Sequence, residues 1–204
     1  MEAESRPRLV AAATLAALAA VAALAISVLD TFTGTRIAES RERAAMAVVA
    51  EALPVDHDND LLADRITVSD PLRPPLRGPV TVYRARRGGQ PAGVVLVPVR
   101  ARGYSGTIDL AIGIRNDGTL AGVRVVRENE TPGLGDRVHQ DRSPWLDRFR
   151  GRSLEDPPAA EWAPGSAGGA FDQLSGATIT SRGVVSAVHA ALEYHAAARE
   201  DLYR

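Results

Sequence analysis

The feature that most constrains this chain is an apolar segment near its N-terminus. Residues 9–29 include no charged side chain and are almost entirely Ala, Leu, Val and Ile. At ~1.5 Å per residue, an α-helix of this length is roughly 31 Å long, which matches the thickness of about 30 Å of a bilayer's hydrocarbon core. We therefore expect one membrane-spanning helix over residues 9–29, followed by enough chain for one globular domain.

Charges on either side of this segment set its expected orientation. Arg6 and Arg8 precede it, and Asp30 follows it. The positive-inside rule then keeps residues 1–8 in the cytoplasm and exports the domain. A cleaved signal peptide is the alternative, because Ala23-Leu24-Ala25 has the small-x-small pattern of a cleavage site. The apolar run exceeds the usual signal-peptide core of about 7–15 residues, which favours an uncleaved anchor.

Composition excludes several classes of chemistry. The chain has no cysteine and no lysine. Thiolate-held iron–sulfur clusters, attached c-type haem, cysteine nucleophiles and lysine Schiff bases are therefore excluded. A net charge of −1 argues against a nucleic-acid partner, which requires a basic face. The acidic run at 56–60 lacks the glycine and the final glutamate of a calcium loop, so no metal site is predicted.

Hydrophobic patterning predicts an α+β domain with a mainly antiparallel, twisted sheet. Residues 80–85 and 92–99 flank Gly88-Gly89, which predicts a hairpin. Residues 108–114 alternate, with four isoleucines and leucines on one face. The Asn116-Asp117-Gly118 sequence then turns the chain into a strand at 120–126. The expected domain occupies residues 80–204.

Helices are expected to flank this sheet. Residues 35–53 have alanines and aliphatic residues at helical spacing, and this amphipathic helix together with a Pro-rich connector makes up residues 30–79. Ser143 and Pro144 predict the start of a short helix. A last helix is expected over residues 182–202. Its histidines, His189 and His195, are six residues apart, so they do not form an i, i+4 metal pair and are expected to be ordinary helix residues.

The chain's most distinctive short sequence ends in a threonine. It runs from Asp172 to Thr178 as Asp-Gln-Leu-Ser-Gly-Ala-Thr. A phosphate can esterify a threonine hydroxyl, and the amides at a helix start can hold the remaining phosphate oxygens. The alternative is an ordinary helix start, with Thr178, Thr180 or Ser181 as the cap. The stretch lacks the Gly-Lys-Ser/Thr of a nucleotide-binding loop and the Gly-x-Ser-x-Gly of a serine hydrolase.

Two further motifs precede this one. The first is Gly103-Tyr104-Ser105-Gly106, which on its own indicates only a turn. The second runs from Glu130 to Asp136 as Glu-Thr-Pro-Gly-Leu-Gly-Asp, and in isolation it is also compatible with a plain Pro-Gly turn. Its glycines allow Leu134 to lie against a flat ring while Thr131 and backbone amides contact the polar ring edges.

Taken in this order, the three motifs resemble those of the G subunit of the Rnf electron-transport complex, also called Rsx. The C subunit of the sodium-pumping Nqr complex is related, and typically has a longer soluble part. The resemblance covers nearly the whole chain and implies one FMN per chain, attached to Thr178 through a phosphoester. The family has a histidine just before the Glu-Thr-Pro-Gly-Leu-Gly motif, where this chain has Glu128 and Asn129.

This resemblance implies an electron carrier, not catalytic alone, in a ferredoxin/NAD-type ion-coupled complex of the bacterial inner membrane, with its domain on the periplasmic side. The implied partners are the other proteins of the complex and a flavin transferase that uses FAD, for which Asp172 is needed. Two alternatives are the C subunit of the sodium-pumping NADH:quinone reductase and a membrane-anchored domain without flavin. The residues expected at the cofactor are Tyr104, Ser105, Glu130, Thr131, Gly133, Leu134, Asp172, Ser175, Gly176, Ala177, Thr178 and Thr180.

Overall fold

The computed structural model describes residues 13–25, 27, 44–69, 78–165 and 168–204. The chain divides into two compact units, Met1–Ala44 and Ala45–Arg204, and each is considered by itself. In the first unit, residues 13–25 are helical. Among the described residues, no helix combines the length and the apolar character that crossing a bilayer requires. The expected span at 9–29 lies partly outside the described residues, and the expected cytoplasmic residues 1–8 lie wholly outside them.

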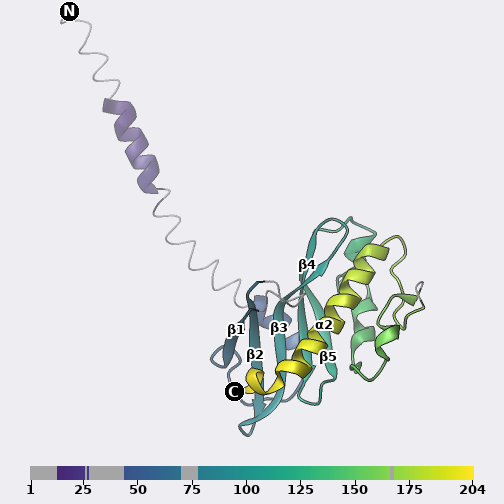
Figure 1. Cartoon of the computed structure of the whole chain (residues 1–204). Helices are drawn as coiled ribbons and strands as arrows, with labels where there is room; N and C mark the ends of the chain where they lie inside the picture. The colour runs from purple at the N-terminus through teal and green to yellow at the C-terminus, as the bar shows by residue number, and fades with distance from the viewer. Residues whose placement is uncertain (1–12, 26, 28–43, 70–77, 166–167) are drawn as a thin grey trace, which may run out of the picture. The chain divides into compact units, whose positions relative to one another are not determined.

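The second unit is built on a five-stranded antiparallel sheet in which each strand pairs with the next along the chain (Figure 1). The strands are β1 (Arg65–Val68), β2 (Val80–Arg87), β3 (Gln90–Arg102), β4 (Thr107–Arg115) and β5 (Leu120–Arg127). Three short 3-10 helices follow, η1 (Gly135–Val138), η2 (Pro144–Phe149) and η3 (Ala159–Glu161), and the chain ends in α2 (Thr178–Tyr203). The antiparallel sheet with flanking helices confirms the predicted α+β class.

Both expected turns join neighbouring strands. Gly88 and Gly89 have φ values of 57° and 76° and connect β2 to β3, a backbone conformation that glycine adopts without strain. Between β4 and β5, the Asp117 carboxylate accepts a hydrogen bond of 2.8 Å from the backbone N–H of Thr119. The sequence did not predict β1, whose four residues are exposed or half-buried and pair only with β2.

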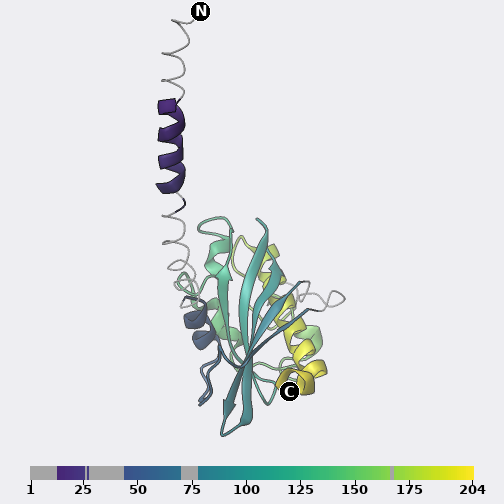
Figure 2. The ribbon, with the colours of Figure 1, turned by 90° about the vertical axis from the view of Figure 1, so that its left-hand side faces the viewer.

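The sheet is covered on both faces (Figure 2). One face packs against α2 and η2, and the residues of β4 with the predicted alternation, Ile108, Leu110, Ile112 and Ile114, lie there fully buried. The opposite face packs against a helix at residues 44–52, which belongs to the predicted amphipathic segment, and residues 35–43 of that segment lie outside the described residues. β4 is therefore buried on both sides.

Small residues allow the helix at 44–52 to approach the sheet closely. A Cβ added at Gly113 would lie 2.0 Å from the carbonyl oxygen of Ala52, and one added at Gly122 would lie 2.9 Å from the same oxygen. Ala111 and Ala121 are buried on this face as well. The end of the helix therefore rests on the sheet backbone itself, and a larger side chain at Gly113 would displace it.

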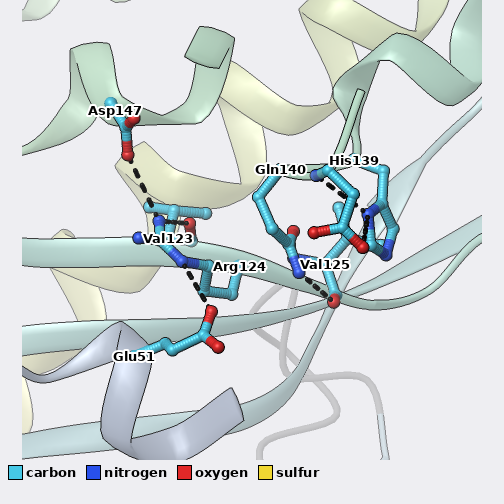
Figure 3. Close-up of polar contacts among 8 residues, drawn as sticks. Glu51, Val123, Arg124, Val125, His139, Gln140 and Asp147 are labelled. Atoms are coloured by element: carbon cyan, nitrogen blue, oxygen red, sulfur yellow. Dashed lines mark hydrogen bonds and ion pairs between the residues drawn. The ribbon is translucent and has the colours of Figure 1, made fainter. Parts of the chain in front are cut away.

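The outer edge of the sheet, β5, is covered by polar contacts (Figure 3). Arg124, whose side chain is 12% exposed, forms ion pairs with Glu51 at 3.3 Å and with Asp147 of η2 at 3.5 Å. The Gln140 side chain accepts a hydrogen bond from the backbone N–H of Val125 at 3.0 Å and donates one to its carbonyl at 3.5 Å. An amide side chain here takes the place of a sixth strand.

Two predicted helix starts can be compared with the structure. Ser143 caps η2 as expected, since its side chain accepts a hydrogen bond from the backbone N–H of Trp145. The last helix starts at Thr178 instead of residue 182, and Ala177 is its N-cap residue, with no side-chain cap bond. The interpretation of Thr178, Thr180 or Ser181 as the cap is therefore wrong.

Candidate functional site

The three sequence motifs meet at one end of the sheet and form a pocket of about 530 Å³. The turn between β3 and β4, the loop after β5 and the start of α2 each contribute to its wall. Pockets that bind small molecules are commonly about 300–1,000 Å³. The lining residues are Tyr104, Glu130, Thr131, Leu134, Gly135, Gly176, Ala177, Thr178, Ile179 and Thr180.

Glu130, in the second motif, connects the first motif to the start of α2 through its carboxylate. The side chain accepts hydrogen bonds from the backbone N–H groups of Tyr104 at 3.2 Å and Ser105 at 2.9 Å. The hydroxyl of Thr180, on α2, donates a third bond to the same carboxylate. Glu130 is only 7% exposed, and a Cβ added at Gly103 or Gly135 would lie 2.3 or 2.5 Å from its oxygens. The glycines on either side thus leave the room that this buried acid needs.

Thr178 is the exposed first residue of α2. Its hydroxyl accepts a hydrogen bond from the Gln173 side chain. Ser181 holds the preceding turn, because its hydroxyl accepts from the backbone N–H of Leu174 at 3.1 Å and donates to the carbonyl of Ala177 at 3.0 Å. The backbone N–H of Ser181 donates to the same carbonyl, while the first N–H groups of any helix have no intrahelical acceptor. A hydroxyl and helix-start amides are therefore presented together beside the pocket.

Exposed apolar side chains surround the pocket. Tyr104 is 73% exposed, Leu134 is 44% exposed and Ile179 is 49% exposed. Leu134 also lies against the turn before Thr178, since a Cβ added at Gly176 would be 2.9 Å from its Cδ2. Gly176 has a φ of 78°, which suits glycine in this turn. Three apolar surfaces around a concave site match the requirements of a flat aromatic ligand.

Asp172 lies apart from the pocket lining. Its carboxylate pairs with Arg148 of η2 at 2.5 Å, and its backbone carbonyl accepts a bond of 2.6 Å from the indole of Trp145. The preceding Phe171 is 2% exposed, and its ring centroid lies 4.6 Å from that of Phe149 and 4.9 Å from that of Trp162. An aromatic cluster therefore holds the start of the motif in place.

The two helix histidines have neighbours typical of a core. His189 packs against Trp162, with ring centroids 5.1 Å apart, and His195 lies beside Tyr203. His195 is 2% exposed. Burial, together with the nearby Arg199, lowers the pKa of His195 from 6.5 to about 4, so the ring is neutral at physiological pH.

The pocket contains eight of the twelve predicted site residues: Tyr104, Glu130, Thr131, Leu134, Gly176, Ala177, Thr178 and Thr180. The other four are outside its lining: Ser105 donates to Glu130, Gly133 and Ser175 lie in the flanking turns, and Asp172 pairs with Arg148. Two lining residues, Gly135 and Ile179, were not among the residues predicted from the sequence, nor were Gln173 and Ser181, which bind Thr178 and the turn before it. Ile179 could have been identified as a residue of the pocket wall, because it is apolar and directly follows Thr178.

Comparisons with known proteins agree with this geometry. Residues 103–193, which include every lining residue of the pocket, match the family model described as FMN-binding domain. The G subunit of the ion-translocating oxidoreductase complex of Pseudomonas aeruginosa is 42% identical over 204 residues, covering 99% of this chain and 95% of the relative. This chain belongs to the G-subunit family.

Another G subunit and one solved structure are also similar. The G subunit of Cereibacter sphaeroides is 40% identical over 185 residues, covering 90% of this chain and 82% of the relative. The crystal structure of Shewanella oneidensis NqrC is 26% identical, with a TM-score of 0.45, covering 67% of this chain and 68% of that one.

Proposed function

We propose that this chain carries FMN in an ion-translocating oxidoreductase complex, covalently attached through Thr178. The observation that carries the proposal is the exposed Thr178 hydroxyl at the start of α2, opening onto a pocket built from all three motifs. When bound, the flavin ring accepts and donates electrons, while the protein orients it and tunes its environment. The membership in the G-subunit family and the match to the FMN-binding domain support this role.

The residues present fit a phosphate ester at Thr178. Esterification joins Oγ1 to phosphorus, and with an FAD donor it breaks the bond between the two phosphates, releasing AMP and the hydroxyl proton. The N-terminus of a 26-residue helix favours negative charge at this place. Thr180 is a poor acceptor for the same chemistry, because it is fully buried and donates to Glu130.

The pocket beside Thr178 suits the flavin ring. Tyr104, Leu134 and Ile179 present apolar surface to it, and burying an aliphatic side chain is worth roughly 1.5–3 kcal/mol. Thr131 provides a hydroxyl at the same wall. Glu130 acts on the flavin ring indirectly, because its carboxylate already binds the backbone and side-chain groups that shape the pocket wall.

We further propose that residues 9–29 anchor the chain in the bacterial inner membrane, with the flavin domain predicted at 80–204 on the periplasmic side. Residues 30–79 precede it and add β1 and the helix at 44–52 to its sheet. Arg6 and Arg8 before the apolar run support this orientation. The partners in this proposal are the other proteins of the complex and a flavin transferase that reaches Asp172 and Thr178 in the same compartment. A reporter active only in the cytoplasm, fused after Arg204, is expected to stay inactive, and activity would reverse the orientation.

The experiment that tests the attachment compares Thr178→Ala with Ser175→Ala, a matched loss of one exposed hydroxyl in the same motif. Both variants are produced as full chains with the transferase, denatured, separated by gel electrophoresis and examined for flavin fluorescence. We expect Ser175→Ala to retain the flavin and Thr178→Ala to lose it while keeping its native circular dichroism. Fluorescence that survives in Thr178→Ala would move the attachment site, and a colourless wild-type chain would favour a domain without flavin.

A further inference from the structure

A second cavity, of about 480 Å³, adjoins the flavin pocket. It lies between the end of β3 and the first turns of α2, where a Cβ added at Gly183 would be 1.8 Å from the carbonyl oxygen of Arg102. Ile179 lines both cavities. Arg102 in the second cavity and Tyr104 in the first are separated only by Gly103. The two cavities are therefore neighbouring parts of one surface.

Arginines dominate the polar lining of the second cavity. Arg100, Arg102 and Arg182 all contribute to its wall, and among the described lining residues there is no carboxylate. Arg102 and Arg182 are both exposed. In the part of the chain that the structure describes, neither of these two side chains forms an ion pair. Both guanidinium groups are consequently available to an anion.

The position of Arg182 directs it toward Thr178. The two residues are four apart on α2, so they share a face and lie one turn from each other. Helical side chains lean toward the N-terminal end of their helix, so the Arg182 side chain extends in the direction of the turn that carries Thr178, and it lines the second cavity together with Ile179. Arg102, at the end of β3, lines the same cavity as Ile179, and its backbone carbonyl lies against Gly183 of α2.

The flavin pocket itself provides no full positive charge. Its described lining includes no arginine, lysine or histidine, and it contains the Glu130 carboxylate. The start of α2 contributes only a partial charge of about +0.5. A phosphate placed at Thr178 therefore lies beside a buried acid and gains most from the arginines of the neighbouring cavity. Guanidinium groups suit this task because their planar donors match phosphate oxygens.

We propose that Arg102 and Arg182 form the phosphate subsite of the flavin pocket, holding the phosphate end of FMN while the ring occupies the space between Tyr104, Leu134 and Ile179. The inference rests on the proposed function, that the pocket binds FMN at Thr178. It assigns a binding role to two arginines outside the three motifs, and it predicts that the site distinguishes flavins by their phosphate.

The test uses the untethered site. The full chain with Thr178→Ala, purified in detergent without flavin, is titrated with FMN and with riboflavin, which lacks only the phosphate, and the quenching of flavin fluorescence is followed. We expect FMN to bind at least about tenfold more tightly than riboflavin. Adding Arg102→Gln or Arg182→Gln is expected to weaken FMN binding by about three- to tenfold each, leaving riboflavin binding unchanged.

Arg150→Gln is the matched control, because Arg150 is an exposed arginine outside both cavities and its loss changes the net charge equally. Arg150→Gln should leave the preference for FMN over riboflavin unchanged. If both flavins bind equally, or if the preference survives the double Arg102→Gln, Arg182→Gln variant, the phosphate subsite is overturned and the flavin pocket stands. If neither flavin binds, the pocket and its subsite are both overturned.

Discussion

Replacing Glu130 by glutamine should weaken the contacts that this carboxylate makes between the second motif, the first motif and the start of α2. The substitution keeps the size of the side chain and removes its charge. An amide oxygen can still accept from the backbone of Tyr104 or Ser105, but the amide nitrogen is a donor and faces groups that are themselves donors. At least one of the three hydrogen bonds is therefore lost, and the others become neutral.

The magnitude follows from these contacts. Hydrogen bonds to a charged group contribute about 1.5–3 kcal/mol each, and neutral ones about half of that. Because Glu130 is only 7% exposed, water replaces the lost acceptor poorly. The glutamine also removes the desolvation cost of a buried charge, which offsets part of the loss. We expect Glu130→Gln to lower the free energy of unfolding by about 2–3 kcal/mol.

Urea unfolding of the full chain in detergent provides the assay, with tryptophan fluorescence as the signal, because Trp145 and Trp162 are both buried in the core. Glu128→Gln is the matched control, since the Glu128 carboxylate accepts from the backbone N–H of Glu130, two residues along the chain. It should cost less than about 1 kcal/mol. Equal losses in the two variants, or an unchanged midpoint in Glu130→Gln, would refute the view that Glu130 holds the Tyr104 turn and the start of α2 together.

Two further predictions concern the ring contact and the buried histidine. Leu134→Ala should keep covalent flavin but weaken the binding of the ring to the pocket by about 1 kcal/mol, which raises flavin fluorescence. Val126→Ala, at a similar exposure of 42%, should leave the fluorescence unchanged. A wild-type spectrum in Leu134→Ala would show that Leu134 is only a turn residue. His195 has a pKa of about 4 in the folded chain against 6.5 when unfolded, so the unfolded chain takes up the proton first as the pH falls. The free energy of unfolding therefore has its full value above about pH 6.5 and falls by on the order of 3 kcal/mol as the pH drops to about 4. Urea midpoints across this range should flatten in His195→Gln but not in the exposed control His57→Gln, and an undiminished pH slope in His195→Gln would contradict this assignment.

The sheet could be predicted because its signals are local. Alternation over residues 108–114 and the Gly88-Gly89 turn depend on neighbours within a few positions, and these are the parts that the structure confirms. β1 gave no such signal, because its four residues have little burial and take their strand conformation from pairing with β2. The burial of β4 on its second face depends on a helix more than 50 residues earlier, which its own alternation did not reveal.

The site was predicted by motif, but its internal contacts were not. Glu130 was expected at the ring, whereas its partners Tyr104, Ser105 and Thr180 lie 25 to 50 residues away along the chain. The start of α2 was placed too late because apolar periodicity begins only at Val184, and the first turn instead points its exposed side chains, Thr178 and Ile179, toward the pocket. Long-range partners of polar groups leave no periodic trace in a sequence.

Burial of β4 on both faces has a consequence for the rate of electron transfer. Local opening is rarest where burial is greatest, and the Tyr104 turn leads directly into this strand. A wall fixed to the most protected strand shifts little when the charge beside it changes. In an electron carrier, smaller displacements between the oxidised and reduced forms mean a lower reorganisation energy. We therefore expect Gly113 and Gly122, which allow the helix at residues 44–52 to pack on the sheet, to favour electron transfer by keeping the pocket wall in place.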